Sequence, residues 1–146
     1  MILLWYHCFC PMKLITRNID YAVRALCFIA NSKARIVAVT TLVKELKIPR
    51  PFLRKILQTL HKKGILKSSK GYGGGFSLAR ASSKIFLTDL IRIFQGQLKL
   101  NECILKKKIC PDRSICLLKG KIDDIEKYVI SKLDSVSVES LLKRKD

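Results

Sequence analysis

Apolar residues recur at helical spacing early in the chain. In the segment 20–30, DYAVRALCFIA, an apolar stripe contains Val23, Leu26, Cys27 and Ala30. This spacing predicts an amphipathic helix. Because Cys27 belongs to the stripe, we interpret it as a core residue rather than a metal ligand.

Two further helices are predicted on either side of the proline-containing segment KIPRP, residues 47–51. The first begins at the pair Thr40 and Thr41, whose hydroxyls can cap a helix N-terminus, and continues through LVKEL. The second starts with Pro51 in its first turn, where the missing N–H costs nothing, and stops at Gly64. The short connection between them is typical of a helix-turn-helix unit.

The second of these helices, RPFLRKILQTLHKKG, has two distinct faces. Its predicted apolar face consists of Phe52, Leu53, Ile56, Leu57 and Leu60. Its other face carries Arg50, Arg54, Lys55, Gln58 and Lys62. An amphipathic second helix with a basic free face is typical of the recognition helix that enters the major groove of DNA.

A glycine-rich loop, KGYGGGF, follows this helix between the short apolar runs ILKSS and FSLAR. Such runs on either side of a glycine-rich turn predict a β-hairpin, and a hairpin after a helix-turn-helix is a wing. We expect the glycines to let the wing backbone lie close to DNA, with Lys70 placed for phosphates or the minor groove. The loop matches neither the dinucleotide-binding nor the nucleoside-triphosphate glycine motif.

Two helices are predicted in the second half of the chain. LTDLIRIFQG begins with Thr88 as a cap and ends near Gly96. KIDDIEKYVISKL keeps helical spacing at Ile122, Ile125, Val129 and Leu133. The second helix either packs onto its own domain or covers its apolar face with a second copy of the chain. We favour the homodimer, whose two-fold symmetry would match a palindromic operator in double-stranded DNA.

These elements predict a mainly α-helical fold with a small β-hairpin wing. We expect a winged helix-turn-helix domain over residues 12–80. Residues 81–146 would then contain a helix, a cysteine-containing loop and a long dimerisation helix. Residues 1–11 are expected to be an extension absent from the natural protein, because MKLITRNIDYAVRAL, from Met12, reads as an ordinary protein start.

The net charge of the chain indicates which class of molecule it binds. The 146 residues include 29 lysines and arginines against 11 acidic residues, a net charge of +18. This charge indicates a polyanion, either nucleic acid or an anionic membrane surface. No apolar stretch is long enough to span a membrane, and the opening MILLWYHCFC lacks the basic residues of a secretory signal. We therefore expect a cytoplasmic protein whose cysteines remain reduced.

Three cysteines, Cys103, Cys110 and Cys116, lie in the segment CILKKKICPDRSIC. Their spacing does not favour the paired knuckles of a zinc ribbon. Three thiolates with one distant ligand can hold an iron–sulfur cluster. The alternative is three reduced cysteines without a ligand, and spacing alone leaves both interpretations open.

The motifs DYAVRAL, IPRPFLRKILQTLHKKGIL and KGYGGGF, with the three-cysteine segment, resemble a known family. This is the winged-helix regulator family that includes IscR, NsrR, RirA and CymR, often called the Rrf-two family. The resemblance covers nearly the whole chain from Met12 and implies a homodimeric DNA-binding regulator. In many members an iron–sulfur cluster controls operator affinity.

The resemblance also implies a set of cluster ligands. Cys103, Cys110 and Cys116 match the three cysteine ligands of the family. The IscR-like subgroup has a histidine where this chain has Lys119, which cannot replace it as a ligand when charged. The NsrR-like pattern uses an aspartate early in the first helix, matched by Asp20, contributed across the dimer. We therefore favour a 4Fe-4S over a 2Fe-2S cluster; Asp20 as a simple helix-terminal residue is the alternative.

On the DNA side, the resemblance places Arg50, Phe52, Arg54 and Lys55 at the major groove. Arginine and lysine there can read guanine edges or contact phosphates, and the sequence does not separate these roles. The full set of candidate DNA-binding residues is Arg50, Phe52, Arg54, Lys55, Gln58, Lys62, Lys70, Gly71, Tyr72, Gly73 and Gly74.

The favoured function is a transcriptional regulator, acting as a repressor, whose cluster senses nitric oxide, redox state or iron. A cluster-free winged-helix regulator that responds to a protein or small ligand is the first alternative. A non-specific basic DNA-binding protein is the second. An enzyme with a nucleophilic cysteine is disfavoured, because neither histidine of the chain, His7 or His61, is placed to act as its base.

Overall fold

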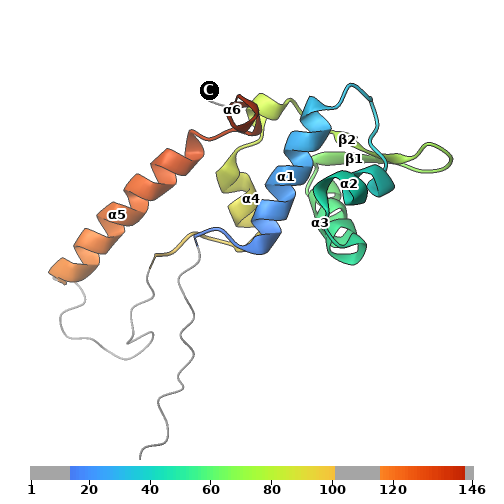
Figure 1. Cartoon of the computed structure of the whole chain (residues 1–146). Helices are drawn as coiled ribbons and strands as arrows, with labels where there is room; N and C mark the ends of the chain where they lie inside the picture. Colours follow the sequence, from blue (N-terminus) through green and yellow to red (C-terminus); the bar gives the residue numbers. More distant parts are fainter. Residues whose placement is uncertain (1–13, 101–115, 144–146) are drawn as a thin grey trace, which may run out of the picture.

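The computed structural model describes residues 14–100 and 116–143 (Figure 1). The chain forms six α-helices, one 3₁₀-helix and two β-strands within these ranges. In order they are α1 (Arg17–Asn31), α2 (Val39–Leu46), α3 (Arg50–Lys62), β1 (Leu66–Ser69), β2 (Gly75–Leu78), η1 (Ser82–Lys84), α4 (Leu87–Phe94), α5 (Leu117–Asp134) and α6 (Val138–Leu142). The predicted fold class, mainly helical with a hairpin wing, is confirmed.

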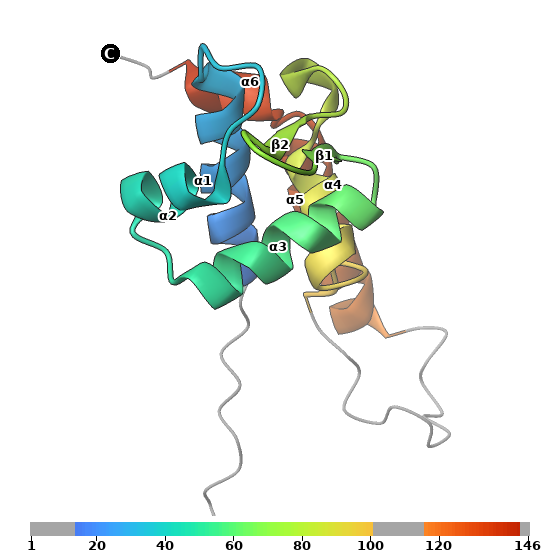
Figure 2. The same ribbon diagram turned by 90° about the vertical axis from the view of Figure 1, so that its right-hand side faces the viewer.

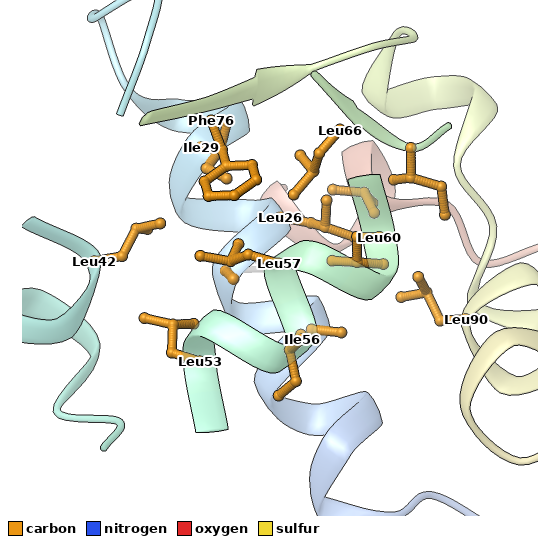
Figure 3. Packing of buried hydrophobic residues seen from close by; sticks show 14 of the residues in the cluster. Leu26, Ile29, Leu42, Leu53, Ile56, Leu57, Leu60, Leu66, Phe76 and Leu90 are labelled. Carbon is orange, nitrogen blue, oxygen red and sulfur yellow. The ribbon is translucent and has the colours of Figure 1, made fainter. Parts of the chain in front are cut away.

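Helix α1 lies at the centre of the molecule and contacts α2, α3, α4, α6 and β2. Leu26 on α1, Leu57 and Leu60 on α3, Phe76 on β2 and Leu90 on α4 converge between these elements (Figure 3). The predicted α1 stripe was partly wrong, because Leu26 is its only fully buried member. Val23, Cys27 and Ala30 are half-buried, and the buried residues of α1 are Ile19, Ala22, Ala25, Leu26 and Ile29.

The hairpin predicted around the glycine loop is present. Strands β1 and β2 pair antiparallel, with Leu66 opposite Leu78 and Ser69 opposite Gly75. A third segment joins this sheet at Val37, whose N–H and C=O both bond to the backbone of Phe76 at 2.9 Å. The chain before α2 therefore fixes the base of the wing.

The backbone conformation and close packing of the wing explain why its loop contains glycines. Gly71 and Gly73 have φ angles of +90° and +75°, which side-chain-bearing residues rarely adopt. A Cβ atom on Gly75 would lie 2.2 Å from the carbonyl oxygen of Val37, and one on Gly74 would lie 2.5 Å from that of Ser69. The shape of the wing requires these glycines, whatever it binds.

Two predicted helix caps were wrong. Helix α2 begins at Val39 with Ala38 as its N-cap, so Thr40 and Thr41 lie inside its first turn. Helix α4 begins at Leu87, and its first free N–H, on Phe86, donates to Oδ2 of Asp89 at 3.3 Å. Thr88 is instead buried, and its hydroxyl donates to Oδ1 of Asp134 at 2.6 Å, which joins α4 to α5.

Helix α5 extends away from the core, on the opposite side of the molecule from the wing (Figure 1). None of its residues is buried, although Leu133 packs against the core and the helix contacts α4. Its C-terminal end turns into α6, where Val138 donates its N–H to Ile85 O at 2.9 Å. No helix within the described ranges is both long and apolar enough to cross a membrane.

Candidate DNA interface and cluster ligands

A groove of about 670 Å³ separates α3 from the wing. Helix α3, the wing and the start of α2 all contribute to its walls. The polar and glycine residues that line it are Thr40, Arg50, Arg54, Gln58, His61, Ser68, Ser69, Lys70, Gly71, Gly74 and Gly75. Figure 2, viewed from the wing side, shows α3 crossing in front of α1 below the hairpin.

The α3 wall of the groove is a stripe of long polar side chains. Arg50, Arg54 and Gln58 are four residues apart, so they lie on one helical face. Leu53 and Leu57 are fully buried in the core and hold this face outward. Because Lys70 adds a third positive charge from the wing and no described lining residue is acidic, the groove has a positive potential.

The free start of α2 adds donors to the same groove. Ala38, Val39 and Thr40 line it, and the first intrahelical bond is donated by the N–H of Leu42 to Ala38 O. The N–H groups of the first helical turn point toward the open end of a helix, where they favour anions such as phosphate. The backbone donors of α2 and the cationic side chains of the groove therefore both favour an anionic ligand.

Five of the predicted DNA-binding residues lie outside the groove lining. Lys55 and Lys62 are exposed on the outer face of α3. Phe52 is 60% exposed, so its predicted place in the apolar core was wrong. Its exposure leaves it free for a ligand, which is the role that the family resemblance implies.

Tyr72 and Gly73 form the tip of the wing. The N–H of Gly74 donates to Gly71 O at 3.0 Å and closes a tight turn around them. Tyr72 is fully exposed at this turn. The aromatic ring therefore projects from the part of the wing furthest from the core.

His61 and Ser68 are among the groove residues that sequence reasoning missed. His61 Nδ1 lies 3.0 Å from Leu66 O, and His61 Nε2 lies 3.2 Å from Ser68 Oγ. The ring therefore connects α3 to β1. Its position eleven residues after Arg50 places it on the groove face, a signal that the sequence contained.

Of the three predicted cysteine ligands, Cys116 lies within the described residues; Cys103 and Cys110 lie outside them. Cys116 is exposed at the N-cap of α5, and its Sγ accepts the backbone N–H of Lys119 at 3.4 Å. A thiolate at a helix N-terminus faces the positive end of the helix dipole. Lys119 itself pairs with Asp123 of α5 at 3.5 Å.

Asp20, the predicted fourth ligand, lies in the first turn of α1. Its carboxylate is about half exposed, and Oδ2 lies 3.9 Å from Nη1 of Arg24. Helices α1 and α5 begin at the same end of the molecule but apart from one another in both views (Figures 1 and 2). Within the described ranges no three histidine, cysteine or acidic residues come together as a metal site.

Comparison with known proteins agrees with this architecture. Residues 15–144 match the Rrf2 family, described as an iron-dependent transcriptional regulator. A protein of Aquifex aeolicus assigned as an HTH-type transcriptional regulator is 32% identical over 127 residues, which are 86% of this chain and 88% of that protein. The regulator NsrR of Bacillus licheniformis is 27% identical over 137 residues, 92% of this chain and 95% of that protein.

The fold is also that of a solved structure, CymR, the global cysteine regulator of B. subtilis. The two share a TM-score of 0.73 at 20% identity, over 92% of this chain and 100% of that one. Together with the family match, these similarities confirm a transcriptional regulator rather than an enzyme. The chain therefore belongs to the Rrf2 family of DNA-binding transcriptional regulators.

Proposed function

We propose that the chain is a homodimeric repressor that binds a palindromic operator in double-stranded DNA. An iron–sulfur cluster that responds to nitric oxide, redox state or iron controls its affinity. The protein acts in the cytoplasm, where DNA and reduced thiols are found. The observation that carries the DNA-binding part is the groove between α3 and the wing, whose described lining includes Arg50, Arg54 and Lys70 and no acidic residue.

The groove can contact both the phosphate backbone of DNA and the base edges in its major groove. Helix α3 presents Arg50, Arg54 and Gln58, all of which can hydrogen-bond to bases in the major groove. The start of α2 and Lys70 supply donors and charge for phosphates. Lys55 and Lys62, exposed on the outer face of α3, extend the basic surface. The exposed rings of Phe52 and Tyr72 add apolar contact at the two ends of the interface.

The exposed face of α5 supports the dimer. Leu117, Ile125 and Tyr128 are 86%, 55% and 63% exposed, and their spacing of eight and three residues places them on one face. Large apolar side chains grouped on one helix face are typical of a surface that a partner covers. A second copy of the chain would supply the same face across a two-fold axis.

Cys103, Cys110 and Cys116 of one subunit, with Asp20 of the second, are the proposed ligands of a 4Fe-4S cluster. The donor set fits, because three thiolates and a carboxylate are ordinary iron ligands, and Cys116 is exposed at the start of α5. When bound, the cluster supplies an iron whose weak oxygen ligand can be exchanged. Cys116 would connect the state of the cluster to α5, and Asp20 would connect it to α1, the centre of the DNA-binding core.

Charge removal in the groove tests the DNA-binding part. Arg54→Ala should weaken binding to a duplex that the protein has selected from a random pool by about tenfold, because one base or phosphate contact contributes about 1–3 kcal/mol. Lys127→Ala is the matched control: it removes the same charge from an exposed residue of α5. Equal losses in the two variants, measured by fluorescence anisotropy, would favour the non-specific DNA-binding protein instead.

Native mass spectrometry of the anaerobically purified protein tests the dimer and the cluster together. We expect two chains, each with four irons and four sulfides. Ile125→Asp should yield monomers by placing a charge in the apolar face of α5, whereas Lys127→Ala should not. A dimer that remains free of cluster after anaerobic reconstitution would favour the cluster-free regulator.

A further inference from the structure

His61 connects the recognition helix to the wing through both nitrogens of its ring. Nδ1 lies 3.0 Å from the carbonyl oxygen of Leu66, and Nε2 lies 3.2 Å from the hydroxyl oxygen of Ser68. Both partners belong to β1, while His61 is in the last turn of α3. The ring is also part of the groove lining, to which Gln58 and Lys70 belong as well.

The chemistry of the two partners fixes one proton and leaves the other exchangeable. A carbonyl oxygen can only accept, so Nδ1 carries a hydrogen and donates it to Leu66 O. A hydroxyl can donate or accept, so Ser68 donates to Nε2 when the ring is neutral and accepts from it when the ring is charged. His61 can therefore gain or lose a proton at Nε2 without losing either hydrogen bond.

The groove that the ring lines also carries charged side chains. From α3, Arg50 and Arg54 line the same groove; from the wing, Lys70 does. The start of α2 contributes Ala38, Val39 and Thr40, which do not titrate. Lys62 and Lys63 follow His61 in the chain without lining the groove, and Lys67 points to the opposite face of β1 from Ser68.

The described lining of the groove therefore contains three cations and no carboxylate. A bound DNA backbone reverses this balance, because its phosphates neutralise the three cations and attract a fourth positive charge. When Ser68 accepts from the charged ring, its own hydrogen becomes free to point toward a phosphate oxygen.

We propose that His61 is a proton-coupled positioning residue of the DNA interface: it holds the wing against α3 and takes up a proton when the groove binds DNA. The proposal rests on the proposed use of this groove. Because DNA binding favours the charged ring, binding should strengthen as the pH falls from about 8 to about 6. This direction follows because a group that binds its proton more tightly in the complex than in the free protein adds affinity on the acid side.

Isothermal titration calorimetry tests the proposal with the full-length protein and a duplex that it has selected from a random pool. Titrations in phosphate and in Tris, whose ionisation enthalpies differ, report the protons taken up on binding. We expect wild-type protein to take up part of a proton per subunit at about pH 7, and to bind roughly three- to tenfold more tightly at about pH 6 than at about pH 8.

Three variants separate the charge of His61 from its structural role. His61→Gln should remove the His61 part of both the proton uptake and the pH dependence, and His61→Arg should show the same flatter profile because its charge is permanent. Ser68→Ala should keep the proton uptake while weakening binding at every pH. Contributions from other groups, His7 included, persist in all variants and cancel in the comparison.

Two results would overturn the role of His61 while leaving the proposed function intact. The first is tight binding to a selected duplex without proton uptake, and the second is an unchanged pH profile in His61→Gln. Failure to select any preferred duplex would overturn the proposed function itself, and this inference with it. The two failures are therefore distinguishable in a single series of titrations.

Discussion

Helices α3 and α5 are both amphipathic, yet the chain uses their apolar faces differently. Of the 13 residues of α3, Leu53, Ile56, Leu57 and Leu60 are buried, whereas none of the 18 residues of α5 is. Leu117 and Leu118 at the start of α5 are 86% and 70% exposed. The difference indicates that α3 completes a core within one chain, while α5 presents an apolar surface that the described part of the chain does not cover.

The largest expected effect follows from removing a side chain from the buried face of α3. Leu57→Ala should lower the free energy of unfolding by about 2–5 kcal/mol, because the residue is fully buried and α1 and α3 cannot fully collapse into the cavity. Urea denaturation followed by circular dichroism measures the change.

Ile125→Ala on α5 is the matched control. At protein concentrations where the chain is a monomer it should cost less than about 0.5 kcal/mol, since the side chain is more than half exposed. Equal losses in the two variants would contradict the distinction between the two helices.

A smaller effect is expected where the wing meets the rest of the chain. Gly75→Ala should cost about 2 kcal/mol, because its Cβ would lie 2.2 Å from Val37 O and break the backbone pairing of Val37 with Phe76. The same variant should bind selected DNA more weakly, since the base of the wing moves. Thermal unfolding and anisotropy measure the two effects.

Gly120→Ala provides the opposite case on α5. Its Cβ would meet no heavy atom within 4 Å, and the residue is in the helix. The substitution should stabilise the protein by about 0.5–1 kcal/mol, because alanine favours helices. A stabilised Gly75→Ala would show that the close approach to Val37 is not a constraint.

A side-chain hydrogen bond between Thr88 and Asp134 helps to join α4 to α5. Thr88→Val should cost about 1 kcal/mol, because the buried hydroxyl donates to Asp134 at 2.6 Å and valine keeps the shape without the donor. Thr41→Val, at an exposed position of α2, is the control and should change stability little. If hydrogen exchange in α5 is no faster in Thr88→Val, the bond does not hold α5 to α4.

Periodicity and turn chemistry predicted most of the fold. The stripe of α3 apart from Phe52, the stop at Gly64 and the hairpin around residues 70–76 are local features, so the sequence alone was enough. Elements η1 and α6 were not predicted, because three and five residues are too short for a periodic pattern. The pairing of Val37 with Phe76 joins distant segments and leaves no local signal.

The site was predicted less completely, for a related reason. Residue type placed Phe52 in the core, but its position on α3 faces outward. The hydroxyl of Thr88 suggested a cap, whereas tertiary structure gives it a distant partner, Asp134. The role of His61 depends on where β1 runs beside α3, which periodicity cannot supply. The roles of Cys103 and Cys110 remain predictions from the sequence.

The smallest expected effect is a difference in reactivity between the two described cysteines, one on α1 and one at the start of α5. Burial raises the pKa of the Cys27 thiol on α1, whereas Cys116 is exposed at the start of α5. In apo protein, iodoacetamide should therefore modify Cys116 well before Cys27, because only the thiolate reacts. Peptide mass spectrometry at successive times measures both rates in one sample.

The raised pKa of Cys27 also gives a direction to the pH dependence of stability. The thiol ionises at lower pH in the unfolded chain than in the folded one. The stability that the neutral, partly buried thiol contributes to the fold is therefore fully present below about pH 8.5. It is lost as the pH rises through the folded-state pKa. Cys27→Ala should flatten the alkaline decline, and an identical decline in this variant would mean that other groups cause it. Because Cys27 is only half-buried, the variant tests how firmly α1 excludes water at the edge of the core.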